Sequence, residues 1–241
     1  MLITSLDNAK IKEYKKLQLR KYRDKKKQFI VEGEHLVLEA YKTGCIDELI
    51  LEKDEIFPLN VETVYVTNEI INKISTLEDP QNVMALCHTK SSDFLGTRIL
   101  LLDEIQDPGN LGTIIRSAVA FNIDTIVLGN NTVDVYNPKV VRASQGMIFH
   151  VNIISKSITE IIETLKKDNF VIYGTKVTHG ESLKNISAPS KYAIVMGNEG
   201  NGMSDEVSNL CDKFIYIDMN QQCESLNVGV ATSIILYQLS K

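Results

Sequence analysis

Short, mostly apolar runs in the second half of the chain constrain its fold more than any other feature. A run that is apolar at every position, such as 99–102, is typical of a strand covered on both faces. Helical patterns alternate with most of these runs, which predicts an α/β fold with a mostly parallel sheet and helices on both faces. We expect strands at 99–102, 125–128, 149–154, 171–174, 192–196 and 214–217, and helices at 111–121, 158–168, 204–211 and 228–239.

The first 90 residues carry a separate, smaller α/β pattern. Residues 91–97 have the Ser- and Gly-containing composition of a linker. We therefore predict an N-terminal domain of residues 1–90, a linker of residues 91–97 and a C-terminal domain of residues 98–241. Within the first domain we expect strands at 29–33, 46–51, 61–66 and 83–87, and helices at 35–43 and 69–74.

The composition is that of a globular protein, with 44% hydrophobic and 24% charged residues in a chain of 241. No apolar run approaches the ~18 residues of a membrane-spanning helix, and the first residues are too polar for a signal peptide. The four cysteines are scattered and form no Cys-x-x-Cys pair. We expect a cytoplasmic protein with reduced thiols, no membrane partner and no metal site.

The charge is unevenly distributed. A net charge of −5 argues mildly against a nucleic-acid partner, yet the segment from Lys10 to Lys27 holds ten Lys and Arg against two acidic residues. The segment is either a solvated helix face or an arm that binds RNA phosphates, ordered before the RNA binds or only with it. The candidate phosphate contacts are Lys15, Lys16, Arg20, Lys21 and Arg23.

Three stretches of the C-terminal domain combine small and polar residues in patterns that suit a binding site. Asn110-Leu-Gly-Thr-Ile-Ile-Arg116 opens a helix, and Arg116 is either a surface arginine or a ligand contact. The Gly-rich loop after the strand at 192–196 has neither dinucleotide-binding nor P-loop spacing, which argues against a nucleotide cofactor held by such a loop. Glu-Ser-Leu-Asn at 224–227 precedes the last helix, where Ser and Asn serve either as caps or as site residues.

Together these stretches resemble the three signature motifs of the SpoU (TrmH-like) branch of the SPOUT RNA methyltransferases, in the family's order. They are Asn110-x-Gly-x-x-x-Arg116, then Gly197-Asn-Glu-Gly-x-Gly-x-Ser204, then Glu224-Ser-Leu-Asn-Val228. A fourth stretch, Asn137-Pro-Lys-Val-Val-Arg-Ala-Ser144, also matches, and it adds Lys139 and Arg142 as candidate RNA contacts. The resemblance covers residues 98–241, and the N-terminal part is similar to a small substrate-binding domain related to ribosomal proteins.

The resemblance implies a methyltransferase that acts on the ribose 2′-hydroxyl of structured RNA and uses S-adenosylmethionine. It implies a SPOUT α/β fold, in which the C-terminal segment of a mostly parallel sheet is threaded as a trefoil knot, and a homodimer. Ribosomal RNA of the 23S type is favoured over tRNA because the basic N-terminal domain suits docking on RNA. The alternative is a non-catalytic RNA-binding or ribosome-assembly protein that retains the fold.

The family pattern also implies roles for single residues. Arg116 takes the ribose proton or, because a guanidinium is normally protonated, orients the hydroxyl and the phosphate. Asn110, Glu199, Ser225 and Asn227 organise the catalytic site around it. The residues expected to hold the cofactor are Thr175, Gly197, Ile217, Met219 and Leu226.

The chain departs from the family pattern in the loop before the last helix. Asp218 stands where the family usually has Pro, and Gln221 stands where it usually has Gly. A Gly permits backbone shapes that Gln does not. The conformation of this loop is therefore the point at which the resemblance needs the structure.

Overall fold

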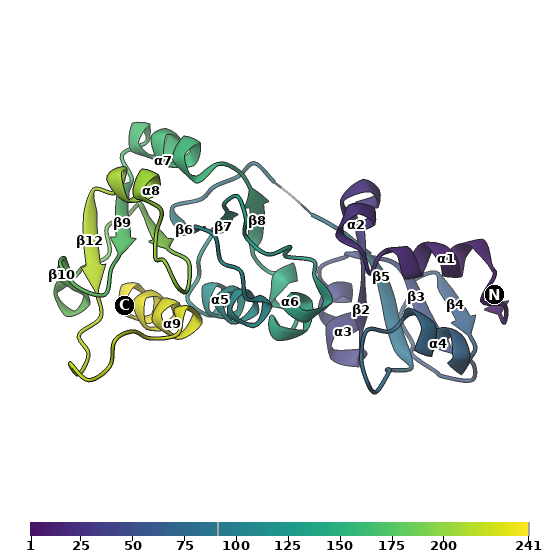
Figure 1. The fold of residues 1–241 in the computed structure, drawn as a ribbon. Coiled ribbons are helices and arrows are strands. Elements are labelled where there is room, and N and C mark those ends of the chain that lie inside the picture. The colour runs from purple at the N-terminus through teal and green to yellow at the C-terminus, as the bar shows by residue number, and fades with distance from the viewer. Residues whose placement is uncertain (91, 241) are drawn as a thin grey trace. The chain divides into compact units, whose positions relative to one another are not determined.

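A computed structural model describes residues 1–90 and 92–240, which divide into two compact units (Figure 1). The first unit consists of residues 1–90 and 134–149, and the second consists of the other described residues. Each unit has its own sheet.

The first unit contains a mixed five-stranded sheet in the order β1-β4-β3-β5-β2. β4 pairs in parallel with β1 and β3, whereas β5 is antiparallel to both of its neighbours. The strands are β1 (Leu2–Ile3), β2 (Gln28–Glu32), β3 (Ile46–Glu52), β4 (Thr63–Val66) and β5 (Val83–His88). The helices are α1 (Ala9–Lys16), α2 (Arg20–Lys26), α3 (Glu34–Lys42) and α4 (Asn68–Ile74).

The basic segment forms the two helices α1 and α2. Asn8 caps α1 by accepting a hydrogen bond from the Lys10 N–H at 2.9 Å. Ile11 and Tyr14 are buried in the same core cluster as Ile70 of α4, so one face of α1 is apolar and buried while its lysines face solvent.

Residues 134–149 lie in the sequence between two strands of the second unit but pack with the first. Asp134 pairs with Arg23, and the Phe29 ring lies 4.6 Å from the Tyr136 ring and 6.0 Å from the Phe149 ring, between centroids. The segment contains α6 (Pro138–Ala143) and a 3-10 turn, η1 (Met147–Phe149). The predicted domain boundaries stay a prediction, but Lys139 and Arg142 lie in the first unit by their contacts.

The second unit contains a seven-stranded sheet in which every pairing is parallel, in the order β10-β12-β9-β11-β6-β7-β8. The predicted parallel sheet is confirmed. β8 begins three residues later than expected, because Met147–Phe149 forms the turn η1 instead of strand. The strands are β6 (Arg98–Leu102), β7 (Thr125–Leu128), β8 (Asn152–Ser155), β9 (Val171–Thr175), β10 (Glu181–Ser182), β11 (Tyr192–Met196) and β12 (Lys213–Tyr216).

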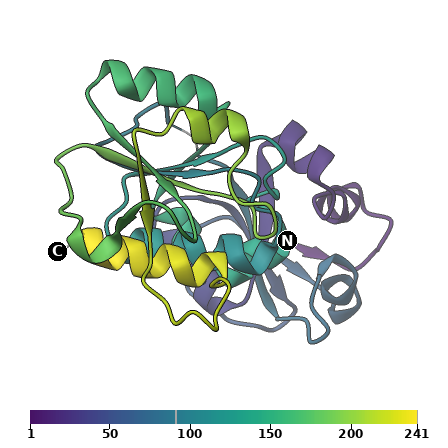
Figure 2. The same ribbon diagram turned by 60° about the vertical axis from the view of Figure 1, so that its left-hand side comes forward.

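Helices cover both faces of this sheet, as Figures 1 and 2 show. α5 (Pro108–Ala120) and α9 (Val228–Leu239) lie side by side on one face. α7 (Ile158–Lys167) and α8 (Asp205–Asn209) lie on the other face, where their side chains join a core cluster with buried side chains of β6, β7, β9 and β11. A second 3-10 turn, η2 (Leu183–Asn185), follows β10.

Two negative findings concern the described residues. None of their helices is both long and apolar enough to cross a membrane. Nor do the side chains described in 1–90 and 92–240 include a group of three or more His, Cys, Asp or Glu that could hold a metal ion.

Candidate active site

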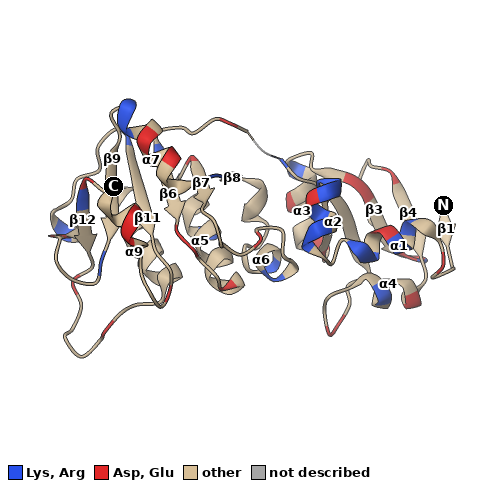
Figure 3. Ribbon diagram, turned by 45° about the horizontal axis from the view of Figure 1, so that its top comes forward, with Lys and Arg blue, Asp and Glu red and all other residues tan. Residues whose placement is uncertain are grey.

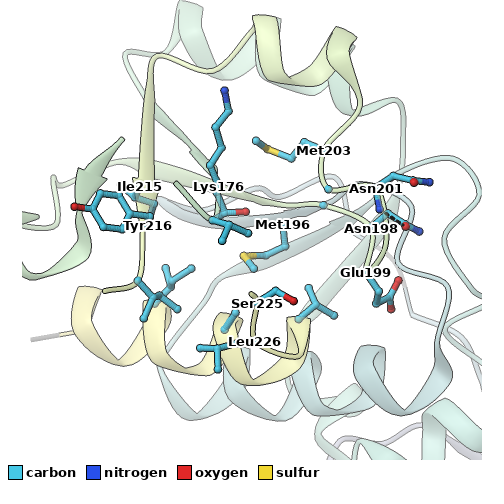
Figure 4. A pocket seen from close by; sticks show the side chains of 18 of the residues that line it. Lys176, Met196, Asn198, Glu199, Asn201, Met203, Ile215, Tyr216, Ser225 and Leu226 are labelled. Carbon is cyan, nitrogen blue, oxygen red and sulfur yellow. Dashed lines mark hydrogen bonds between the residues drawn. The ribbon is translucent and has the colours of Figure 1, made fainter. Parts of the chain in front are cut away.

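The strand order of the second unit brings the carboxyl ends of β9, β11 and β12 together, which is where ligands bind in open parallel sheets. Loops that follow these strands enclose a cavity of about 910 Å³ with residues before and within α9 (Figure 4). All five predicted cofactor residues, Thr175, Gly197, Ile217, Met219 and Leu226, line this cavity. Asn110, Glu199, Ser225 and Asn227 line it as well.

The cavity wall combines apolar side chains with polar side chains and charges of both signs. Met196 and Ile215 form the floor at the strand ends, and Leu226 lies opposite them (Figure 4). Lys176 and Asp205 also line the cavity, and the Lys176 ammonium stacks 3.7 Å from the centre of the Phe214 ring. Such a wall suits a ligand with an apolar body and both positive and negative groups.

Asn198 organises the Gly-rich loop, a role that the sequence did not reveal. Its backbone pairs with Gly202 in both directions, and its side chain accepts from the N–H groups of Gly200 and Asn201 at 2.9 and 3.1 Å. A side chain on Gly197 would begin 2.2 Å from the Gly202 backbone, so the loop closes only with Gly there. The sequence feature that indicates this turn is an Asn within a Gly-rich segment, because an Asn side chain accepts from backbone N–H groups that follow it.

The loop is anchored at its end by Asp103 at the end of β6. Both the N–H and the hydroxyl of Ser204 donate to one Asp103 oxygen, at 2.8 and 2.9 Å. Asp103 is buried, so this bond fixes the start of α8 against the sheet. Neighbouring Thr175 donates its hydroxyl to the Val195 carbonyl at 2.8 Å, which ties β9 to β11 beside the cavity.

A chain of three polar side chains lies at the mouth of the cavity. The Glu199 carboxylate accepts from the Asn110 amide at 3.0 Å and from the Asp107 N–H at 3.3 Å. The Asn110 oxygen then accepts from the Asn227 amide at 2.8 Å. Residues far apart in the sequence, at the starts of α5 and α9 and in the Gly-rich loop, are thereby joined.

The amide groups in this hydrogen-bonded series can be oriented in only one consistent way. A carboxylate only accepts, so the Asn110 NH₂ has to face Glu199 and its oxygen has to face Asn227. The Asn227 NH₂ then faces Asn110, which leaves the Asn227 oxygen for the first turn of α9. That oxygen does accept there, from the Gly229 N–H at 3.0 Å and the Val230 N–H at 3.3 Å.

Asn227 therefore has both of the roles that the sequence left open, since it caps a helix and is also a residue of the site. Ser225 lines the cavity, and its hydroxyl has no hydrogen-bond partner among residues 1–90 and 92–240. Its hydroxyl is free to bind a ligand.

Arg116 is the one predicted catalytic residue that lies outside the cavity lining. It is exposed on α5, and among the described residues its guanidinium forms neither an ion pair nor a hydrogen bond. α5 itself is fixed against α9, where the Ser117 and Ser233 hydroxyls lie 2.6 Å apart. Arg116 is thus a free cation on a fixed helix.

Gln221 does not adopt the backbone conformation that favours Gly. The non-Gly residues with positive φ among those described do not include it, so the turn at 221–222 forms without strain at this position. The departure from the family pattern at Gln221 is therefore compatible with the loop.

The candidate RNA contacts divide into paired and free cations. Of the ten Lys and Arg in the basic segment, Lys10, Lys12, Lys16, Arg20, Arg23 and Lys26 form ion pairs. Arg23 is the most enclosed of them, since it is 4% exposed and its guanidinium donates to Asp134 and to the carbonyls of Leu17 and Gln18. Arg142 is half-buried and donates to the Thr76 hydroxyl at 3.0 Å, whereas Lys139 is exposed.

Comparison with known proteins agrees with this geometry over the whole chain. Residues 97–237 match the SpoU rRNA Methylase family, and residues 8–85 match the MRM3-like substrate binding domain. The chain is 37% identical to the 23S rRNA (guanosine(2553)-2′-O)-methyltransferase RlmP of Bacillus subtilis, over 98% of both proteins.

Solved structures agree as well. The chain is similar to an RNA 2′-O ribose methyltransferase, with a TM-score of 0.81 and 26% identity over 99% of this chain and 97% of that one. It is also similar to the AdoMet-bound rRNA methyltransferase of Sinorhizobium meliloti, with a TM-score of 0.87 and 26% identity over 99% and 96%. These likenesses confirm the expected fold and the family resemblance. The chain therefore belongs to the SpoU rRNA Methylase family and is an RNA ribose 2′-O-methyltransferase.

Proposed function

We propose that this enzyme methylates the ribose of a guanosine in 23S ribosomal RNA with S-adenosylmethionine as the methyl donor. The observation that carries the proposal is the Glu199–Asn110–Asn227 chain at the mouth of the cavity. A protein that only bound RNA would have no need to join three distant polar side chains there. The choice of 23S rRNA and guanosine is supported by the similarity to RlmP of Bacillus subtilis, a 23S rRNA (guanosine(2553)-2′-O)-methyltransferase.

The cavity fits S-adenosylmethionine. Its volume of about 910 Å³ lies within the range of cofactor sites. Apolar Met196, Ile217 and Leu226 suit the adenine ring, while Lys176 and Asp205 offer partners for a carboxylate and an ammonium group. When bound, the cofactor supplies a methyl group that its sulfonium activates for in-line displacement.

The protein then has to place the ribose hydroxyl, which loses its proton to solvent water as its oxygen takes the methyl group. We assign to Asn110 and Asn227 the orientation of the groups at the cavity mouth, with Glu199 fixing both amides. The free hydroxyl of Ser225 is a further contact for the RNA or the cofactor. To Arg116 we assign the binding of the ribose hydroxyl and its neighbouring phosphate, because an unpaired guanidinium offers several donors in a planar fork.

The direct test is a methyl-transfer assay on unmodified transcripts. The enzyme would be incubated with S-adenosyl-[methyl-³H]methionine and either a 23S rRNA transcript or a pool of tRNA transcripts. We expect label only in the 23S rRNA, in a dinucleotide that resists alkaline hydrolysis because its 2′-oxygen is methylated. Binding of the cofactor and of 23S rRNA without any label would instead favour the non-catalytic RNA-binding alternative.

The first unit offers a phosphate-binding surface formed by cations without acidic partners. Figure 3 shows Lys and Arg on α1, α2 and α4. Lys15, Lys25 and Lys27 have no ion-pair partner among the described residues. The charge of Lys73 on α4 lowers the pKa of Lys15, so the two ammonium groups are close enough to repel each other. An RNA phosphate bound there would relieve this repulsion.

We predict that Lys15→Glu and Lys73→Glu each weaken 23S rRNA binding and reduce the salt dependence by about one counterion. Lys53→Glu is the matched control, because Lys53 is an exposed lysine of the first unit that lies outside these helices. Filter binding over a range of KCl concentrations measures both quantities. Equal losses for all three variants would mean that only net charge matters.

We also propose that the enzyme is a homodimer that uses α9. Val230, Ile234 and Tyr237 recur on one side of the helix and are 46%, 37% and 54% exposed. A second copy would cover this apolar stripe. Light scattering should give a dimer for the wild type and a monomer for Ile234→Glu, and a monomeric wild type would contradict the proposal.

A further inference from the structure

The segment between β12 and α9 forms one wall of the cavity yet is weakly attached to the rest of the second unit. Among the described residues, the backbone of residues 219–226 hydrogen-bonds only within the segment, where the Cys223 N–H donates to Asn220. Its far end is held by Asn227, through Asn110 and the first turn of α9. The position of Met219 and Leu226 in the wall therefore depends on what holds the near end.

Asp218 holds the near end. Its carboxylate accepts a hydrogen bond from the Ser182 hydroxyl and lies 3.6 Å from the Lys184 ammonium. Ser182 is the last residue of β10, and it pairs with Tyr216, the last residue of β12. The hydrogen bond from Ser182 to Asp218 therefore lies directly beyond the last pairing of these two strands. The Ser182 hydrogen bond lowers the pKa of Asp218.

We call the contacts of Asp218 with Ser182 and Lys184 the clasp. The Asp218 side chain points away from the cofactor cavity, so the clasp leaves that cavity open for a ligand. Ile217 and Met219, its two neighbours, both line the large cavity, whereas Asp218 does not. Asp218 instead lines a second cavity of about 140 Å³ with Leu183, Lys184 and residues of α9. The clasp thus lies behind the wall, and its carboxylate is positioned to act on the cofactor through the residues on either side.

We propose that Asp218 is a positioning residue for the methyl donor, which sets its affinity by holding Ile217 and Met219 in the cavity wall through Ser182 and Lys184. The proposal rests on the proposed use of S-adenosylmethionine. Loss of the clasp leaves the wall in its binding-competent position for a smaller fraction of the time. The apparent Kd rises by the inverse of that fraction, so a tenfold loss of the competent state weakens binding about tenfold.

The test is calorimetric titration of the full-length protein with S-adenosylmethionine. We expect Asp218→Ala to raise the Kd about tenfold, and Asp218→Asn, which keeps an acceptor for Ser182 but loses the charge toward Lys184, to raise it less. Ser182→Ala should add little to Asp218→Ala, because both remove the same bond. Gln222→Ala is the matched control, since that exposed side chain of the same segment forms no side-chain hydrogen bond among the described residues.

Two further readouts separate positioning from folding. In the cofactor-free protein, amide hydrogen exchange of residues 219–226 should be faster in Asp218→Ala, with an unchanged melting temperature. At saturating RNA, KM for S-adenosylmethionine should rise while kcat stays the same. A Kd within twofold of the wild type and unchanged exchange would overturn the proposal, whereas a wild type that does not bind the cofactor would overturn the proposed function instead.

Discussion

Replacing Arg116 with alanine is expected to lower kcat for 23S rRNA about 10²-fold, the size of the loss when a reacting group is no longer held in position. Arg116 is exposed and forms neither a hydrogen bond nor an ion pair with the described residues, so its removal leaves no unpaired group behind. The melting temperature and the Kd for S-adenosylmethionine should therefore equal those of the wild type. Single-turnover methyl transfer with bound cofactor measures the expected loss.

Arg116→Lys distinguishes charge from geometry. A lysine retains the positive charge but has no planar fork of donors, so it should recover only a small part of the lost rate if Arg116 orients the hydroxyl and the phosphate together. Full recovery by lysine would mean that charge alone suffices. Arg116→Ala with wild-type activity would remove Arg116 from the reaction altogether.

Asn227→Asp is expected to lower kcat about 10²-fold while leaving the protein as stable as the wild type. An Asp oxygen still accepts from the Gly229 and Val230 N–H groups, and its charge suits a helix N-terminus. It has no N–H for the Asn110 oxygen, however, and it brings a second carboxylate toward Glu199. The Asn110 amide could then no longer accept from residue 227 while donating to Glu199.

Asn227→Ala loses both functions and should cost about 1 kcal/mol of unfolding free energy in addition to activity. Ser157→Ala is the matched control, because Ser157 caps α7 in the same unit and does not line the cavity. It should show a similar loss of stability with full kcat. Urea unfolding and initial rates on the three variants test these expectations, and an active Asn227→Asp would contradict the role of the amide chain.

The sequence alone was sufficient to predict the parallel sheet, and its resemblance to a known family indicated nine of the residues that line the cavity. Buried parallel strands have to be apolar along their whole length, and this local property is visible in runs such as Ile99–Leu102. The motif residues were recognised through that resemblance, and the structure shows that Gly197 and the helix cap Asn227 each also meet a local backbone requirement. For these features the physical cause lies within a few residues of the chain.

Features that depend on contacts between distant residues appeared only in the tertiary structure. Arg23 reads as one more cation in a basic run, but Asp134, 111 positions away, pairs with it and buries it. Asp218 reads as a departure from a family pattern, but Ser182 makes it the clasp of the cavity wall. Whether a charged side chain faces solvent, a phosphate or a carboxylate depends on the partner that folding brings to it, and spacing along the sequence carries no record of that partner.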